Sequence, residues 1–199
     1  MESGVPSQAQ VVIIGGGVIG CAVAWQLAQL GCSDVVVLER GKISCGTTWH
    51  SAGNIIRMNT DPVTVEIFSE SARVVRELAS RHEIGWRNCG RIMLARTETR
   101  LQEFQNIVTQ LGNQGVEVQE ISAEEAGNRI PLLNTDDVIG ALWSPGDGRV
   151  DPSGLTDAYR REAKEAGAMF VEGIAALNAQ IDANQVRGVV TDQGEITCE

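Results

Sequence analysis

The start of the chain alternates short apolar runs with one segment of helical spacing. Residues 11–14 (VVII) and 35–38 (VVVL) are continuous apolar runs, as expected for strands that are buried on both faces of a sheet. Between them, residues 18–30 repeat apolar side chains at helical intervals, and Gly31 stands where helices commonly end in a left-handed conformation. This pattern predicts a βαβ unit.

The middle of the chain predicts further helices among shorter strands. Thr60-Asp61-Pro62 places a capping side chain before a proline at the first helical position, which predicts a helix from there to about His82. Asp151-Pro152 repeats this arrangement and predicts a helix to Ala166, closed by Gly167. The other predicted elements here are strands over residues 90–95 and 116–121, a helix over 98–111, a short helix capped by Ser122, and two extended pieces around a turn at 145–148.

The segment after Gly167 alternates strands and turns, and the chain stops within its last predicted hairpin. A doubly wound sheet needs more parallel strands than this pattern supplies. We therefore expect an α/β fold in which these residues are the N-terminal portion of a larger protein. A compact stand-alone domain is the alternative.

The composition favours a small molecule as the binding partner. The 43% of hydrophobic residues can supply a core, and a formal net charge of −10 repels nucleic-acid backbones and anionic membrane surfaces. No segment reaches the roughly 18 to 20 apolar residues that span a bilayer. We therefore expect neither a nucleic-acid partner nor a membrane partner.

The cysteines and the opening residues bear on the compartment. Five scattered cysteines without a CxxC pair argue for a reducing environment, and against a disulfide framework or a zinc site. The opening MESGVPSQAQ resembles neither a secretory signal nor an arginine-rich import leader. We expect a cytoplasmic protein, or one of the mitochondrial matrix if a leader was removed, and we predict no metal site.

A glycine motif lies between the first predicted strand and helix. Gly15, Gly17 and Gly20 form GxGxxG, in which the first glycine permits a sharp turn, the second admits a pyrophosphate and the third allows close packing of the helix. Glu39 ends the next strand, where a carboxylate accepts hydrogen bonds from ribose hydroxyls. A glycine-rich packing turn is the alternative, but the register favours dinucleotide binding. The motif alone leaves nicotinamide and flavin dinucleotides open.

The chain resembles one family of flavoproteins in the stretches VVIIGGGVIGCAVAWQLAQLG, VVVLERG, GTTWHSAGN and PLLNTDDVIGALWSPGDGRVDPSGL. This family comprises the sarcosine and dimethylglycine dehydrogenases, among the amine-oxidising flavoproteins of glutathione-reductase-like and D-amino-acid-oxidase-like fold. The pairing of TWHSAG with PGDGRVDPSGL is more specific than the glycine motif. The resemblance covers nearly the whole chain and implies FAD in an extended form, with its adenine half on the glycine turn and its ring at the loop after the second strand.

The resemblance also implies which residues hold the cofactor. In the family, the histidine of the Trp-His pair is joined covalently to the methyl group on the flavin benzenoid ring, and His50 occupies that position. Most substrate contacts and proton-handling side chains of the family lie beyond this chain, so we nominate no catalytic residue. The implied cofactor-binding residues are Gly15, Gly17, Val18, Ile19, Gly20, Glu39 and Arg40 for the pyrophosphate and adenosine, Gly46, Thr47, Thr48, Trp49, His50, Ser51, Ala52 and Gly53 for the flavin, and Ile174 for the adenine.

The proposed bond at His50 is chemically reasonable. A neutral imidazole is a nucleophile near pH 7, and the flavin methyl becomes electrophilic when the ring tautomerises. The alternative for His50 is a solvated loop histidine that is hydrogen-bonded to the backbone. Trp49 has two readings, as a flavin-lining residue and as a core residue.

Four other polar residues are expected to have structural roles. Cys45 is interpreted as a small residue in a tight loop, and His82 as a polar residue that interacts with a helix dipole. Asp147 and Asp151 suggest an acid/base pair, but a turn residue and a helix cap explain them better.

We expect three segments along the chain. Residues 1–84 are the first part of a Rossmann-like FAD-binding domain, and residues 85–145 are part of an interleaved α+β substrate or cap domain. Residues 146–199 return to the FAD-binding domain, which is incomplete at the C-terminus. We expect this portion to be inactive by itself, because half of the flavin site and most of the substrate site would be missing.

The resemblance implies the oxidation of an N-methylated amino acid or amine, such as sarcosine or dimethylglycine, by hydride transfer to FAD. The imine product would give formaldehyde, or a one-carbon adduct of a folate bound elsewhere in the full-length protein. The electron acceptor, oxygen or an electron-transfer flavoprotein, stays open. The alternatives are a noncovalent flavin amino-acid oxidase and a non-catalytic protein like the family's pyruvate dehydrogenase phosphatase regulatory relative.

Overall fold

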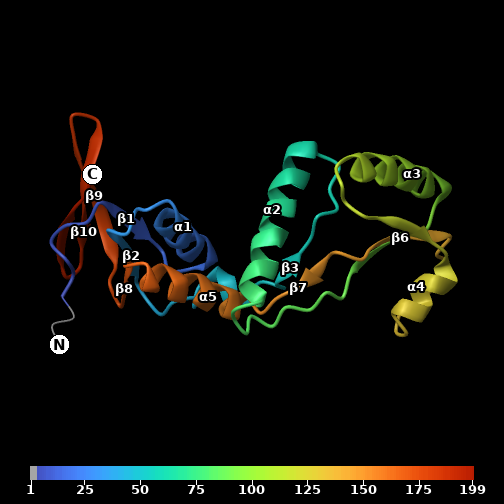
Figure 1. Ribbon diagram of the computed structural model, residues 1–199, viewed down its shortest axis with the longest axis horizontal. Helices are drawn as coiled ribbons and strands as arrows, with labels where there is room; N and C mark the ends of the chain where they lie inside the picture. Colours follow the sequence, from blue (N-terminus) through green and yellow to red (C-terminus); the bar gives the residue numbers. More distant parts are fainter. Residues whose placement is uncertain (1–3) are drawn as a thin grey trace. The chain divides into compact units, whose positions relative to one another are not determined.

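A computed structural model describes residues 4–199, which fall into two compact units (Figure 1). Unit 1 combines the chain up to Ala52 with Asp151–Glu199, and unit 2 is Gly53–Val150. Residues 1–3 of the first expected segment lie outside the described range. The two units reflect packing alone, so the functional boundaries expected after residues 84 and 145 stay a prediction.

Unit 1 contains a parallel sheet and two helices that lie side by side (Figure 1). The strands are β1 (Val11–Ile14), β2 (Val35–Glu39) and β8 (Met169–Glu172), in the order β1-β2-β8. The helices are α1 (Val18–Gln29) and α5 (Pro152–Glu165). The predicted βαβ unit is therefore present, and a strand from the far end of the chain extends its sheet.

The two strands of the βαβ unit differ in burial. The four valine and leucine residues of β2 are buried, as predicted. The prediction of burial on both faces is wrong for β1, where Ile14 is 64% exposed, because β1 lies at the edge of the described sheet. On α1, Ile19 and Leu30 are exposed as well. Apolar residues therefore lie on the exposed side of α1 as well as on its buried side, and this pattern is typical of a helix that is buried on all sides.

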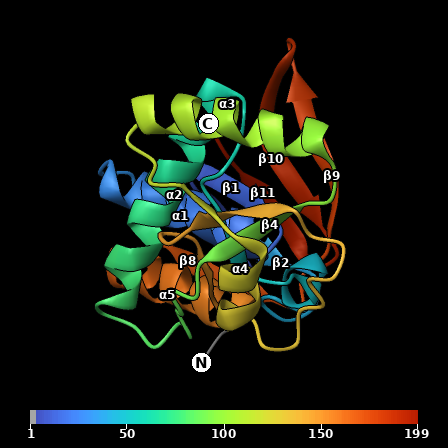
Figure 2. The same cartoon turned by 90° about the vertical axis from the view of Figure 1, so that its right-hand side faces the viewer.

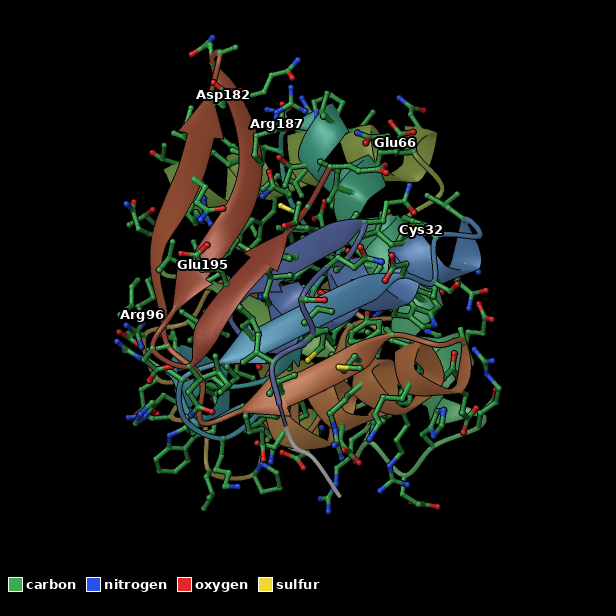
Figure 3. The ribbon with its side chains drawn as sticks, turned by 90° about the vertical axis from the view of Figure 1, so that its left-hand side faces the viewer. Cys32, Glu66, Arg96, Asp182, Arg187 and Glu195 are labelled. Atoms are coloured by element: carbon green, nitrogen blue, oxygen red, sulfur yellow. The ribbon has the colours of Figure 1, made fainter. Side chains whose placement is uncertain are left out.

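An antiparallel sheet packs against the parallel one within unit 1. Its strands are β9 (Ala176–Asp182), β10 (Gln185–Thr191) and β11 (Gly194–Thr197), in the order β11-β10-β9. Val189 and Ile196 of this sheet share a hydrophobic cluster with Val36 and Leu38 of β2. The hairpin between β9 and β10 ends beside Asp182 (Figure 3).

Unit 2 is a three-stranded antiparallel sheet between helices (Figure 2). The side chains of β6 alternate: Leu142 packs with Phe104 of α3, and Ala141 packs with Ala126 of α4. This alternation places α3 and α4 on opposite faces. The elements are β4 (Arg91–Ala95), β5 (Gln119–Ile121) and β6 (Gly140–Ser144) in the order β4-β6-β5, the helices α2 (Pro62–Ala79), α3 (Glu98–Asn113) and α4 (Ala123–Arg129), and the pair β3 (Asn54–Ile55) with β7 (Gly148–Arg149).

The helix starts follow the capping side chains. The carboxylate of Asp61 accepts the N–H of Thr64 at 2.7 Å, and Asp151 accepts the N–H groups of Ser153 and Gly154 at 3.1 and 3.0 Å. Hydrogen bonds from the hydroxyl and N–H of Thr64 lower the pKa of Asp61. Ser122 caps α4 as predicted. Asp151 is therefore a helix cap, as its sequence context indicated.

Cys21 on α1 is expected to resist alkylation in the folded full-length protein. Its side chain is fully buried, and this burial raises the pKa of the thiol to about 12. Because the thiolate is the reactive form, iodoacetamide at about pH 8 should modify the exposed Cys45 and leave Cys21 unmodified, as measured by peptide mass spectrometry. Both should react after denaturation, and equal native rates would contradict the prediction.

Candidate functional site

The glycine turn connects β1 to α1 through a conformation that side chains resist. Gly15 has a φ of +108°, in the left-handed region. A Cβ on Gly20 would come within 2.0 Å of the carbonyl oxygen of Gly15, so the helix and the turn are in close contact there. A Cβ on Gly16 would meet the movable Cδ1 of Ile43 at 2.3 Å and the Cβ of Glu39 at 3.0 Å, so this position is crowded as well, which the motif did not indicate. The turn therefore has the tight geometry of a phosphate-binding loop.

Glu39 is fixed by backbone donors at the end of β2. Its Oε2 accepts the N–H of Gly16 at 2.8 Å, and its Oε1 accepts the N–H of Gly41 at 2.8 Å. A carboxylate has about four acceptor positions, so it can still accept ribose hydroxyls. The acid predicted from spacing thus also holds the glycine turn in place.

The loop after β2 is attached to the same turn. The hydroxyl of Thr48, in the short 3-10 helix η1 (Thr47–His50), accepts the N–H of Val18 at 3.0 Å. The N–H of Ser44 donates to the carbonyl of Gly16 at 3.0 Å. The N-cap residue of α1 is Gly17, which has no side chain that could accept a hydrogen bond from the first turn of the helix. Thr48 therefore caps α1 from a distant part of the sequence, a role that sequence reasoning did not predict.

Replacing Thr48 by valine should destabilise the protein. Valine keeps the shape but leaves the partly buried N–H of Val18 without an acceptor, which costs about 1 to 2 kcal/mol. Urea unfolding of the full-length protein, followed by circular dichroism, measures the change. The matched control is Thr47→Val on the exposed side of η1, which should leave stability unchanged. Equal midpoints for the two variants would contradict the capping role.

A cavity of about 460 Å³ brings several predicted residues together in unit 1. Gly15, Glu39, Arg40 and Ile174 all line it. The N–H of Ile174, in the loop after β8, donates to the carbonyl of Glu39 at 3.1 Å, which joins this loop to the end of β2. The remaining lining residues are Ile14, Leu38, Ala175, Ala176 and Leu177. This mostly apolar hollow beside a carboxylate fits an adenosine.

His50 and Trp49 lie together on η1. Their rings are 4.3 Å apart at an angle of 40°, and His50 is exposed. Trp49 is 59% exposed, so the reading of Trp49 as a core residue is wrong for this chain. Within residues 4–199, no hydrogen bond holds the imidazole of His50. The ring is therefore accessible for a reaction.

The remaining predicted cofactor-binding residues lie in or beside η1, except for Gly53. Gly46 and Thr47 are exposed near Thr48, and Ser51 and Ala52 follow η1 at the surface. Gly53 belongs to unit 2, where its carbonyl accepts the N–H of Val150 at 2.9 Å.

A second cavity of about 700 Å³ in unit 1 was not predicted. Glu172 lines it and accepts the N–H of Ile43 at 2.7 Å and a bond from Lys42 at 3.0 Å; these bonds lower the pKa of Glu172. No local sequence pattern predicts this cavity, because its lining comes from separated segments. These residues are Ile43, Ser44, Cys45, Trp49, Ser153, Asp157, Arg160 and Glu172.

Asp147 was interpreted as a turn residue, and this reading is incomplete. The side chain is fully buried in unit 2, and Oδ1 accepts the N–H of Arg57 at 3.0 Å. His82 follows the end of α2, where its N–H donates to the carbonyl of Leu78.

Two features are absent from residues 4–199. No group of three or more His, Cys, Asp or Glu side chains in this range could hold a metal ion. None of the helices described there has the length and apolarity needed to cross a membrane.

Comparisons with known proteins agree with this geometry. Residues 10–199 match the profile of a family described as FAD dependent oxidoreductase. The chain is 37% identical over 199 residues to Homo sapiens mitochondrial sarcosine dehydrogenase, and 34% identical over 193 residues to Homo sapiens mitochondrial dimethylglycine dehydrogenase. It is 33% identical over 196 residues to the mitochondrial pyruvate dehydrogenase phosphatase regulatory subunit of Mus musculus. These alignments cover 96%, 95% and 98% of this chain and 22% of each relative, so the chain spans about a fifth of their length.

A solved structure gives the same fold. L-proline dehydrogenase from P. horikoshii matches with a TM-score of 0.92 and 29% identity, over 98% of this chain and 52% of that one. This likeness confirms the predicted α/β fold class.

Proposed function

The chain belongs to the family of FAD-dependent oxidoreductases, and we propose that the full-length protein oxidises an N-methylated amino acid of the sarcosine or dimethylglycine type. One observation carries the cofactor part of this proposal: Gly15, Glu39, Arg40 and Ile174 line one cavity beside the glycine turn. The substrate class rests on the similarity to the two dehydrogenases.

The residues fit the adenosine and pyrophosphate of FAD. Glu39 keeps free acceptor positions for the ribose, and the cavity lined by Ile174 accommodates the adenine. The start of α1, with Gly17 and Ile19, presents a partial positive charge to the phosphates. Thr48 holds this helix start in place through Val18.

The flavin end would be held by the loop from Gly46 to Gly53. We propose that Nε2 or Nδ1 of His50 forms the covalent bond to the flavin, because the imidazole is exposed and has no hydrogen bond within residues 4–199. The flavin methyl group would lose a C–H proton and the imidazole its N–H proton, and the two electrons released would pass through the flavin to the electron acceptor. Trp49 would orient the imidazole through their ring contact. When bound, FAD supplies the hydride acceptor for the amine C–H bond.

The products and partners follow from the same chemistry. Oxidation of an N-methyl C–H bond gives an imine, which water converts to formaldehyde and the demethylated amine, or which a folate elsewhere in the protein captures. Oxygen and an electron-transfer flavoprotein are the candidate electron acceptors. We propose the mitochondrial matrix as the location, since the similar dehydrogenases are mitochondrial.

The test uses the full-length protein under anaerobic conditions. Sarcosine and dimethylglycine should bleach the flavin absorbance, and formaldehyde should appear in proportion to the amine consumed. Bleaching by glycine or proline, with no response to the methylated compounds, would contradict the proposed substrate class. Acid precipitation then separates the two flavin hypotheses: a yellow pellet supports covalent attachment, and a yellow supernatant supports a noncovalent amino-acid oxidase.

The second candidate is a regulatory protein without redox activity. The similarity to the pyruvate dehydrogenase phosphatase regulatory subunit, at 33% identity, favours it. A purified full-length protein that contains no flavin, and takes none up from added FAD, would support this candidate over the enzyme.

A further inference from the structure

Asp147 is a buried acid of unit 2 that the proposed cofactor site does not use. Oδ1 accepts the N–H of Arg57, whereas Oδ2 is buried and accepts from no donor in residues 4–199. An unpaired buried carboxylate oxygen costs free energy, and native structures rarely retain one without a partner. This oxygen is therefore suited to a donor on a bound molecule.

The position of Asp147 is fixed by its neighbours. Its carbonyl accepts the N–H of Gly90 at 2.9 Å, and the preceding Gly146 carbonyl accepts a bond from Arg76 at 2.6 Å. A Cβ on Gly148 would come within 2.3 Å of the carbonyl oxygen of Arg87. The backbone around Asp147 is therefore closely packed on both sides.

Positive charge exceeds negative charge around this acid. Nε of Arg57 lies 3.9 Å from Oδ1 and has no hydrogen-bond partner in residues 4–199. Burial and the charge of Arg57 both lower the pKa of Arg76. One carboxylate thus lies near two guanidinium groups, so the local charge around Asp147 is net positive.

A small cavity opens beside Asp147 within unit 2. Its volume is about 170 Å³, comparable with about five or six water molecules at ~30 Å³ each. Besides Asp147, its lining includes the guanidinium-bearing Arg91, the amide of Asn54 and the apolar Ile56. No ion pair joins Arg91 to a carboxylate within residues 4–199. The residues that line the cavity therefore include an aspartate with one unpaired carboxylate oxygen, an arginine without an ion pair in residues 4–199 and an apolar isoleucine.

We propose that this cavity binds a small zwitterionic amino acid, with its ammonium N–H donating to Oδ2 of Asp147 and its carboxylate pairing with Arg91. Ile56 contacts the apolar carbon atoms of the ligand. Arg91 would repel a simple cation in the cavity, and Asp147 would repel a simple anion. A molecule that carries both charges therefore complements the lining best. This inference rests on the proposed function, because it assigns a ligand of the proposed substrate class to residues of unit 2.

The test separates the two charges of the ligand in the full-length, FAD-loaded protein. The probes are methoxyacetate, which has the carboxylate without an N–H, and dimethylamine, which has the N–H without a carboxylate. Isothermal titration calorimetry measures both affinities, and anaerobic flavin reduction measures the affinity for sarcosine. The variants are Asp147→Asn, which retains an acceptor for Arg57, and Arg91→Gln. The control is Arg96→Gln, because Arg96 pairs with Asp137 on the surface.

The expected pattern is selective. Asp147→Asn should weaken the binding of dimethylamine and of sarcosine by about 10- to 100-fold and leave the affinity for methoxyacetate unchanged. Arg91→Gln should weaken the binding of methoxyacetate and of sarcosine to a similar extent and leave the affinity for dimethylamine unchanged. Arg96→Gln should change none of the three. Melting temperatures confirm that the variants are folded.

Two results would overturn the inference, and they are distinguishable. In the first, the wild type oxidises sarcosine, but each variant either binds all probes like the control or loses affinity for methoxyacetate and dimethylamine to the same extent. The proposed amino-acid subsite is then wrong, and the proposed function stands. If the wild type neither binds nor oxidises any methylated amino acid, an ordered water is the occupant of the cavity and the proposed function fails too.

Discussion

Flavin fluorescence on a denaturing gel should disappear completely when His50 is replaced by alanine in the full-length protein. The imidazole is the proposed nucleophile, and alanine has no atom that can replace it. FAD itself should stay bound in the native variant, because Glu39, the glycine turn and the Ile174 cavity are unchanged. The variant should also oxidise sarcosine more slowly, since an electron-withdrawing imidazole on the flavin makes it a stronger oxidant.

Trp49→Phe is the matched control for this experiment. Phenylalanine keeps an aromatic ring beside the imidazole, so the covalent bond and the fluorescent band should both remain. Fluorescence that survives denaturation in the His50 variant would exclude this histidine as the point of attachment. Mass spectrometry of the flavin-bearing peptide identifies the residue independently.

Gly20→Val should destabilise the protein by about 3 kcal/mol and release FAD. Any Cβ at this position lies within 2.0 Å of the Gly15 carbonyl oxygen, which is backbone and cannot move away like a side chain. The gain in helix propensity over glycine is below about 1 kcal/mol and does not offset this overlap. Relief requires a shift of the turn that carries the phosphate-binding amides. Thermal unfolding and the ratio of flavin to protein after gel filtration measure both effects.

The control for this substitution is Gly112→Val in α3. Gly112 is also a helical glycine, but a Cβ there meets no atom within 4 Å. Its variant should keep its FAD and nearly all of its stability. If both variants retain FAD equally, close contact of α1 with the turn is unimportant for the cofactor.

The secondary structure was largely predictable, because its signals are local. The Asp61-Pro62 and Asp151-Pro152 pairs begin helices in the structure because each aspartate accepts amide bonds within its own first turn. The 3-10 helix η1 and the short strand β3 were not predicted. Their conformations depend on bonds to distant residues, such as Thr48 to Val18, which no local pattern contains.

In the candidate site, too, the features that depend on local sequence were predictable, and those that depend on contacts between distant residues were not. The positions of Gly15, Gly20 and Glu39 followed from spacing, because one βαβ unit carries all three. The burial of Asp147 did not, since it depends on Arg57, Arg76 and Gly90, which come from three other parts of unit 2. Two glycines around an aspartate resemble a solvated turn until those segments are packed together.

The open edge of β1 has a practical consequence for handling this chain by itself. A strand with unpaired N–H and C=O groups, next to exposed Ile14 and Ile19, offers a template for pairing with another molecule. Residues 1–199 expressed alone are therefore expected to form soluble oligomers or inclusion bodies at high concentration. Light scattering during refolding would reveal this self-association, and a longer version of the protein that covers the edge should refold without it.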